Sequence, residues 1–250
     1  MQTNTGPPPI EAGLFHDGDP LLSFTNLLLA LLAATAGTGF LFTLTRSLRE
    51  ARLRAATRAA FLDEVQTLFT GGLKKLNPDG FPRISGTYRG LTFDIQLVPD
   101  TLNFRKLPSL WLLVSLTEPI PVGATFDLMM RPRGIEMFSK FKELPHQMAA
   151  DPAFPHDCAI RTDAPARLPP RQLLLKHTGI LDNPLAKELL ISPRGVRIVW
   201  LAEEANRGNY LLFRDSEMGR LPYPAALAKP LLDYLIGLRD DLAAHPENTP

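Results

Sequence analysis

The feature that most constrains this chain is a run of 26 residues without a charged side chain, at positions 20–45. An α-helix rises about 1.5 Å per residue, so roughly 20 residues cross a hydrocarbon core about 30 Å thick. In lipid, each backbone N–H and C=O must find its partner within the segment, and a helix provides those partners. The run therefore predicts a transmembrane helix over residues 20–45, preceded by a short acidic tail at residues 1–19.

Two other structures tolerate such a run, a fully buried core helix and a cleaved signal peptide. Core helices of this length without a charge are rare. Ala34-Thr35-Ala36 resembles a signal-peptide cleavage site, but the first twenty residues contain no Lys or Arg, which a signal peptide needs near its start. The apolar run also continues past that site to Leu44. We therefore predict an uncleaved anchor.

The charges that flank the run predict its orientation. All 27 Lys and Arg residues lie at or beyond position 46. Five of them, the arginine collar, follow the run closely: Arg46, Arg49, Arg52, Arg54 and Arg58. Basic flanks stay on the cytoplasmic side, so we expect the tail outside and residues 46–250 in the cytoplasm, at the inner membrane if the host is bacterial. Contact with anionic lipid headgroups would be a secondary role of the collar.

Small residues recur along the predicted span at intervals of four. Ala30 and Ala34 form one such pair, and Ala33 and Gly37 form another. This spacing lets two helix backbones approach closely in a membrane, although it is also frequent by chance in Ala-rich spans. These four residues are the candidates for helix–helix packing.

Residues 46–72 predict a juxtamembrane amphipathic helix, because they are rich in Ala, Leu, Arg and Glu and end at Gly71-Gly72. Apolar residues recur along it at a seven-residue interval: Leu48, Ala55, Leu62 and Phe69. Arg58 interrupts the companion positions of this repeat. A helix packed on its own domain is therefore favoured over a coiled coil.

Residues 73–245 predict an α+β domain, followed by a short tail at 246–250. Alternating apolar and polar residues favour one hairpin at 84–88 and 91–98 and another at 187–191 and 196–201. Further strands are expected at 110–116, 124–130 and 210–214, the last completing a meander with the second hairpin. Helical spacing occurs at 135–144 and 225–244. The two β sections, 81–131 and 157–214, would form halves of one sheet or two pseudo-repeats.

Reactive residue types gather at one place, His146 with His156-Asp157-Cys158. Imidazole, carboxylate and thiolate together hold zinc, and a Cys–His pair can act as nucleophile and base. Successive residues on a strand point to opposite faces, so three in a row do not converge on one point. A structural cysteine beside a loop histidine is the favoured interpretation. The sequence therefore predicts no catalytic, cofactor-binding or metal-binding residue, and no cofactor.

The net charge and the residues of the predicted turns bear on two further functions, the binding of nucleic acid and the binding of a phosphate or carboxylate ligand. The formal net charge of +1 is too small to favour nucleic-acid binding. Arg89, Arg194 and Arg207 lie in predicted turns, where an arginine more often keeps the turn soluble than binds a phosphate or carboxylate. His177 is expected to end a short helix, where the helix dipole favours a cation.

Taken together, these patterns predict a single-pass interaction, accessory or assembly protein whose partners are the bilayer and either a protein or a second copy of the chain. One alternative is a membrane-proximal enzyme that uses Cys158 and nearby histidines. The other is an anionic-lipid-binding module that uses the arginine collar. Enzymatic activity is the less expected outcome.

Overall fold

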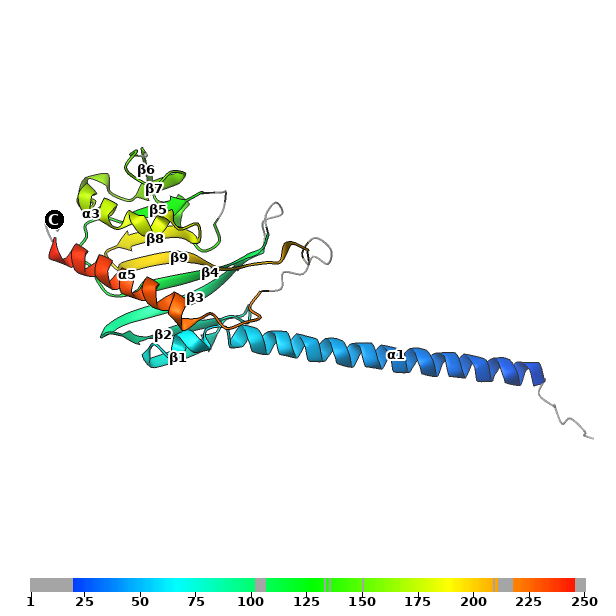
Figure 1. The fold of residues 1–250 in the computed structure, drawn as a ribbon. Helices are drawn as coiled ribbons and strands as arrows, with labels where there is room; N and C mark the ends of the chain where they lie inside the picture. Colours follow the sequence, from blue (N-terminus) through cyan, green and yellow to red (C-terminus); the bar gives the residue numbers. More distant parts are fainter. Residues whose placement is uncertain are drawn as a thin grey trace, which may run out of the picture. The chain divides into compact units, whose positions relative to one another are not determined.

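The computed structural model describes residues 20–101, 107–132, 134, 136–149, 151–208, 210 and 218–245. The chain divides into two compact units, residues 1–51 and 52–250. The described residues of the first unit belong to one helix, and the second unit contains a mixed α+β domain (Figure 1).

Helix α1 (Pro20–Ala59) contains the charge-free run, and its described side chains from Phe24 to Thr57 are all exposed. Its threonine hydroxyls donate to carbonyls of the preceding turn, such as Thr35 Oγ1 to Leu32 O at 2.9 Å. These hydroxyls therefore need no water. The helix is long and apolar enough to cross a membrane.

The helical segment after the run is shorter than predicted. Helix α1 ends at Ala59, a single turn α2 (Asp63–Gln66) follows, and Gly71-Gly72 lie in strand β1 (Thr70–Leu76) instead of ending a helix. The consecutive residues Phe61 and Leu62 are both buried, with exposures of 3% and 0%. The chain leaves the helix here, and both side chains enter the core of the second unit.

The apolar repeat at seven-residue intervals had two interpretations, a coiled coil and packing on the chain's own domain, and the structure shows packing on the domain. Leu62 is fully buried, and Phe69 packs against the same core, with ring centroids 6.3 Å from Tyr88 and 6.4 Å from Phe93. The C-terminal half of the repeat thus belongs to the core of the second unit, as the favoured interpretation predicted.

One antiparallel sheet of nine described strands forms the centre of the second unit, in the order β1-β2-β3-β4-β9-β8-β5-β7-β6 (Figure 1). After β1, its strands are β2 (Pro82–Tyr88), β3 (Leu91–Asp100), β4 (Ser109–Leu116), β5 (Phe126–Met130), β6 (His146–Met148), β7 (Cys158–Thr162), β8 (Ala186–Ser192) and β9 (Gly195–Glu204). Because β4 pairs with β9, the two predicted β sections belong to one sheet. They are not two separate halves, since β5 of the first section lies between β8 and β7 of the second.

Both predicted hairpins are present. Arg89 and Gly90 join β2 to β3 with φ values of 49° and 82°, and positive φ at both turn residues matches the twist of a hairpin. At the start of β9, a side chain on Gly195 would place a Cβ 2.0 Å from the carbonyl oxygen of Leu116. Only glycine allows the β8–β9 hairpin to lie this close to the connection that follows β4.

Two expectations about local structure are wrong. Strand β9 pairs with β4 on one side and with β8 on the other, so the sheet of the described residues does not contain the predicted meander. Tyr210 is helical, and its N–H donates to Asn206 O at 2.9 Å, while residues 211–214 lie outside the described residues. The helix expected at 135–144 is also not found: its described residues contain one 3-10 turn, η1 (Phe141–Glu143). The spacing of Phe138 and Phe141 instead places both rings against the sheet.

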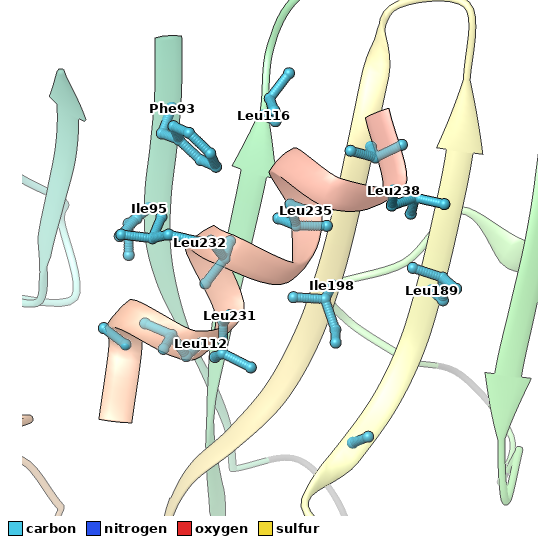
Figure 2. Packing of buried hydrophobic residues seen from close by; sticks show 14 of the residues in the cluster. Phe93, Ile95, Leu112, Leu116, Leu189, Ile198, Leu231, Leu232, Leu235 and Leu238 are labelled. Atoms are coloured by element: carbon cyan, nitrogen blue, oxygen red, sulfur yellow. The ribbon is translucent and has the colours of Figure 1, made fainter. Parts of the chain in front are cut away.

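Helix α5 (Ala225–Ala244) covers one face of the sheet, as the predicted stripe required (Figure 2). Its inward leucines lie over Phe93 and Ile95 of β3, Leu112 of β4 and Ile198 of β9 (Figure 2). The buried residues are Ala228, Leu231, Leu232, Leu235, Leu238 and Leu242. Leu227, which the predicted stripe included, is 57% exposed.

The second face of the sheet is covered in part by residues 136–145. Phe138 and Phe141 pack there on Leu113, Met129 and Val199 in a separate apolar cluster. Towards β2, the same face is polar and half-buried, and Ser85 Oγ donates to Asp94 Oδ1 at 2.8 Å. This second face therefore combines apolar packing with buried polar groups.

Candidate functional site

The residues predicted to act in the membrane all lie on α1. Ala30, Ala33, Ala34 and Gly37 are exposed, and a Cβ built on Gly37 meets nothing within 4 Å. That helix face is therefore free within the described chain to receive a partner helix. The contact itself stays a prediction.

The arginine collar divides into two kinds of residue. Arg46 is exposed and pairs along the helix with Glu50 at 3.0 Å. Arg58 is half-buried, and its guanidinium lies 5.6 Å from the centroid of the Phe81 ring. Arg58 therefore packs within the second unit, to which it belongs. The four arginines before it remain for any contact with headgroups.

The cysteine and histidine grouping is not brought together. His146 lies opposite Thr162 on β7, four residues along the strand from Cys158, a separation of roughly 13 Å at the rise of a strand. Burial raises the pKa of the Cys158 thiol, whereas a nucleophilic thiol needs a lowered pKa. The described residues contain no group of three metal-ligating side chains. This geometry gives no support to the enzyme alternative.

His177 lies directly after the short helix α3 (Arg171–Lys176), as the sequence predicted. Its Nε2 lies 2.8 Å from Asp241 Oδ2 of α5, and Lys176 Nζ donates to the same oxygen at 2.6 Å. The hydroxyl of Tyr234 donates to His177 O at 2.7 Å. These contacts connect α3 to α5, so the role of His177 is structural.

Sequence reasoning missed a cluster of buried charged residues on the second face. Asp127 of β5 and Glu188 of β8 have exposures of 2% and 0%. Arg197 of β9 donates from Nη2 to Glu188 Oε2 at 2.9 Å, and the hydroxyl of Ser139 donates to Glu188 Oε1. The strand register places Asp127 opposite Leu190 and Leu190 opposite Arg197, in one row across three strands.

The two carboxyl groups of this cluster differ in protonation. Burial, and then the negative charge of Glu188, raises the pKa of Asp127 well above its ordinary range. Burial also raises the pKa of Glu188, but the charge of Arg197 and the hydrogen bond from Ser139 oppose the shift. Of the two groups, Asp127 therefore has the stronger tendency to stay protonated, whereas Arg197 favours the ionised form of Glu188.

A second buried ion pair lies beside the first. The strand register shifts between Ala186 and Glu188, and Lys187 at this bulge pairs with Glu136 at 2.9 Å. Both side chains are nearly buried, with exposures of 5% and 6%. A buried ion pair is costly to desolvate, and an apolar pair would hold the segment 136–145 about as firmly.

Two cavities adjoin the cluster. One, of about 610 Å³, which we call the acid-pair cavity, has Asp127, Leu190 and Arg197 in its lining, with Lys140 and Arg194 also contributing. The other, of about 440 Å³, lies against Glu136 and Ser139 and shares Lys140 with the first. Of the turn arginines considered in the sequence, Arg194 is therefore the one that borders a cavity here.

A sequence signal for this cluster existed. Asp127 and Arg197 each stand between two apolar residues of a strand, and Glu188 directly precedes the apolar residues 189–191. A charge in such surroundings is costly unless it has a partner. The periodicity identified these strands, but it does not show which strands become neighbours. Only the order β9-β8-β5 brings the three residues together.

Comparison with known proteins adds little beyond this geometry. No protein-family model matches the chain, and no curated protein sequence matches it. Among solved structures, it is similar to the mycobacterial trehalose monomycolate transport factor A, TtfA, with 9% sequence identity and a TM-score of 0.31. That alignment covers 67% of this chain and 72% of the other. A similarity at this level carries no argument about function.

Proposed function

We propose that this protein is a single-pass, membrane-anchored accessory or assembly protein, with its α+β domain on the cytoplasmic side. The observation that carries the proposal is the exposure of α1. The second unit has a hydrophobic core of its own. Ten large apolar side chains of α1 are exposed: Phe24, Leu27, Leu28, Leu29, Leu31, Leu32, Phe40, Leu41, Phe42 and Leu44.

The free energy of transfer decides where such a helix resides. On the scale measured for insertion of a helix into a membrane, a Leu or Phe at the centre of a span contributes about 0.3–0.6 kcal/mol in favour of lipid, so ten of them contribute roughly 3–6 kcal/mol. The run contains no Asp, Lys or Arg, each of which would oppose insertion by about 2.5–3.5 kcal/mol at the centre. The balance favours lipid, and an anchor is the favoured role of the segment.

The arginine collar supports the proposed orientation. Arg46, Arg49, Arg52 and Arg54 are exposed at the end of the apolar run, and no basic residue precedes the run. Clustered arginines resist translocation, so the side that carries them stays in the cytoplasm.

A protein partner is the second element of the proposal. Tethering a domain to a membrane raises its effective concentration for other membrane proteins without any new contact. The small residues of α1 provide a surface on which another helix can pack closely. This combination suits a subunit of a membrane complex or a homo-oligomer.

The test is purification of the full chain in a mild detergent, with its mass measured by light scattering. We expect a defined oligomer or a stoichiometric protein partner. Replacing Ala34 and Gly37 together with Ile should reduce that assembly, because larger side chains separate the helix backbones. The matched control Leu31→Ile should leave it intact. A partnerless monomer of the unaltered protein would contradict the proposal of an assembly role.

A further inference from the structure

We infer that one end of the sheet in the second unit rests on the bilayer, with exposed apolar side chains in the hydrated headgroup layer of the cytoplasmic leaflet. The inference rests on the proposed function, because it takes α1 to be the anchor. It adds a second contact with lipid, made by the folded domain, which an anchor alone does not require.

The strand register defines the two ends of the sheet. At one end, which we call the anchor end, strands β1, β3, β9 and β5 finish and strands β2, β4, β8 and β7 begin. The turns that join β2 to β3 and β8 to β9 lie at the opposite end. Arg58, in the last turn of α1 and already part of the second unit, lies over the ring of Phe81, directly before β2. The chain that follows the apolar run therefore enters the second unit at the anchor end.

Three exposed leucines lie at the anchor end, and we call them the apolar rim. Leu76 is the last residue of β1, and Leu185 directly precedes β8, with exposures of 52% and 40%. Leu221, at 77%, follows Gly219, where an added Cβ would lie 2.8 Å from the ring of Phe81. Four further exposed side chains of this kind lie on α1, β1, the segment after β5 and α5: Leu53, Leu73, Met137 and Leu227. In the described turns at the opposite end, residues 89–90, 117–125 and 193–194, no large apolar side chain is exposed.

The length of the chain keeps the apolar rim near the bilayer. Residues 46–58 lie between the charge-free run and the contact at Phe81, and as a helix they extend about 20 Å. The run itself is about 39 Å long, and a span that exceeds a hydrocarbon core of about 30 Å tilts, which lowers Arg58 towards the headgroups. The lipid surface is thus the partner that the covalent connection holds beside the rim, whereas a soluble partner has to be recruited.

The charged residues near the rim favour no particular headgroup. Arg207 and Arg220 are exposed at the anchor end, and so are Asp79 and Glu204. Binding at a membrane surface scales with the apolar area that is buried, and attraction to anionic lipid adds to it where basic residues predominate. We therefore expect the same contact with neutral phosphatidylcholine and with an anionic mixture, unlike contact through the arginine collar, which would be electrostatic.

The test locates the rim relative to lipid in phosphatidylcholine nanodiscs that contain the full chain. In a Cys158→Ser background, Leu185→Cys carries an environment-sensitive nitrobenzoxadiazole label, and Arg194→Cys in the β8–β9 turn carries the control label. Leu185 is the decisive position, because β8 is five strands from β1, about 24 Å across the sheet. Its label should emit at shorter wavelength than the control and lose most of its fluorescence to lipids with nitroxide-labelled headgroups. The control should lose little.

Variants of the rim show whether the leucines hold the contact. Leu76→Asp combined with Leu221→Asp places two charges where apolar side chains should meet lipid. Both leucines are exposed, so the fold should tolerate the change. The label at Leu185 should then shift to longer wavelength and escape the nitroxide lipids. The matched control Arg194→Asp, at the opposite end of the sheet, should leave the label at Leu185 unchanged.

Failure of the inference and failure of the anchor give different results. A label at Leu185 that resembles the control, with the protein held in the nanodisc, overturns the surface contact and leaves the anchor intact. A shift to shorter wavelength without quenching by nitroxide also overturns it, because protein, such as a second copy, would then cover the rim. Quenching that requires anionic lipid overturns the apolar basis of the contact. A chain that does not enter nanodiscs contradicts the anchor and the inference together.

Discussion

Helices α1 and α5 are both rich in leucine, yet they meet their surroundings in opposite ways. From Phe24 to Thr57 every described side chain of α1 is exposed, on all sides of the helix. In α5 the leucines 231, 232, 235, 238 and 242 are almost fully buried. Figure 2 shows four of them, Leu231, Leu232, Leu235 and Leu238, over the sheet. Lys229, Asp233 and Arg239 carry charge along the same helix.

The difference lies in the distribution of apolar residues and not in their number. A helix with an apolar stripe needs one apolar neighbour, and the sheet provides it for α5. A helix that is apolar on every side needs an apolar environment on every side, and the described residues provide none for α1. This contrast separates a helix that stabilises a domain from a helix that anchors one.

The largest expected effect comes from placing charge in the middle of α1. Leu31→Arg combined with Leu32→Arg should move the protein out of the membrane fraction, because each central arginine costs about 2.5–3.5 kcal/mol on insertion. Alkaline extraction followed by ultracentrifugation measures the change. The matched substitution Leu227→Arg in α5, at a residue that is 57% exposed, should leave the distribution unchanged. If the α1 and α5 variants were distributed between membrane and supernatant in the same way, α1 would not be the anchor that distinguishes it from α5.

The next effect tests the stripe of α5. Leu235 is fully buried, so Leu235→Ala should lower the free energy of unfolding by about 2–5 kcal/mol, through lost transfer energy and the cavity left behind. Urea denaturation followed by tryptophan fluorescence in detergent would show it. The control Leu227→Ala should change stability by at most about 0.5 kcal/mol. The protein should remain in the membrane fraction in both cases.

A smaller effect should appear on the face of the sheet opposite α5, where polar groups are buried. In the unfolded chain Asp127 titrates near pH 3.9, and in the folded protein at a higher pH. Between these values the native state binds more protons, so stability falls as the pH rises, by roughly 1.4 kcal/mol per pH unit.

Asp127→Asn cannot ionise, so its stability relative to the unaltered protein should increase from about pH 4 upward and level off at the folded pKa. Urea denaturation at several pH values between about 4 and 8 would measure the difference. Parallel pH profiles for the two proteins would mean that Asp127 is not held in its protonated form.

The smallest effect concerns the charged end of α1. Arg46 and Glu50 form an exposed pair whose side chains are 71% and 50% accessible. Arg46→Ala should change the unfolding free energy by less than about 0.5 kcal/mol, because water screens such pairs. It should also preserve topology, since three other exposed arginines remain beside it. Inversion of the domain by this one substitution would contradict an orientation set by the whole collar.

Much of the fold follows from local patterns in the sequence. The apolar run, both hairpins and the C-terminal helix were predictable because each depends on residues close together in the chain. The order of the strands was not, since the pairing of β4 with β9 joins residues about ninety positions apart, with no local signal for the register.

The candidate site could not be predicted for the same reason, because it depends on the order of the strands. Asp127, Glu188 and Arg197 are charged residues that neighbour apolar residues in three separate strands, and each was visible in the sequence. Their convergence depends on β8 lying between β5 and β9. The spacing of Phe138 and Phe141, three residues apart, is typical of a helix and led to the wrong prediction there. Both residues pack on the sheet, and the 3-10 turn η1 begins at Phe141.

The most direct test of the anchor and its orientation uses one introduced thiol. In a Cys158→Ser background, Leu221→Cys places a thiol at a residue of the second unit that is 77% exposed. Intact cells are treated with a membrane-impermeant maleimide before and after permeabilisation. The account predicts labelling only after permeabilisation, with the protein recovered in the carbonate-resistant membrane pellet. Labelling of intact cells, or recovery of the protein in the supernatant, would contradict it.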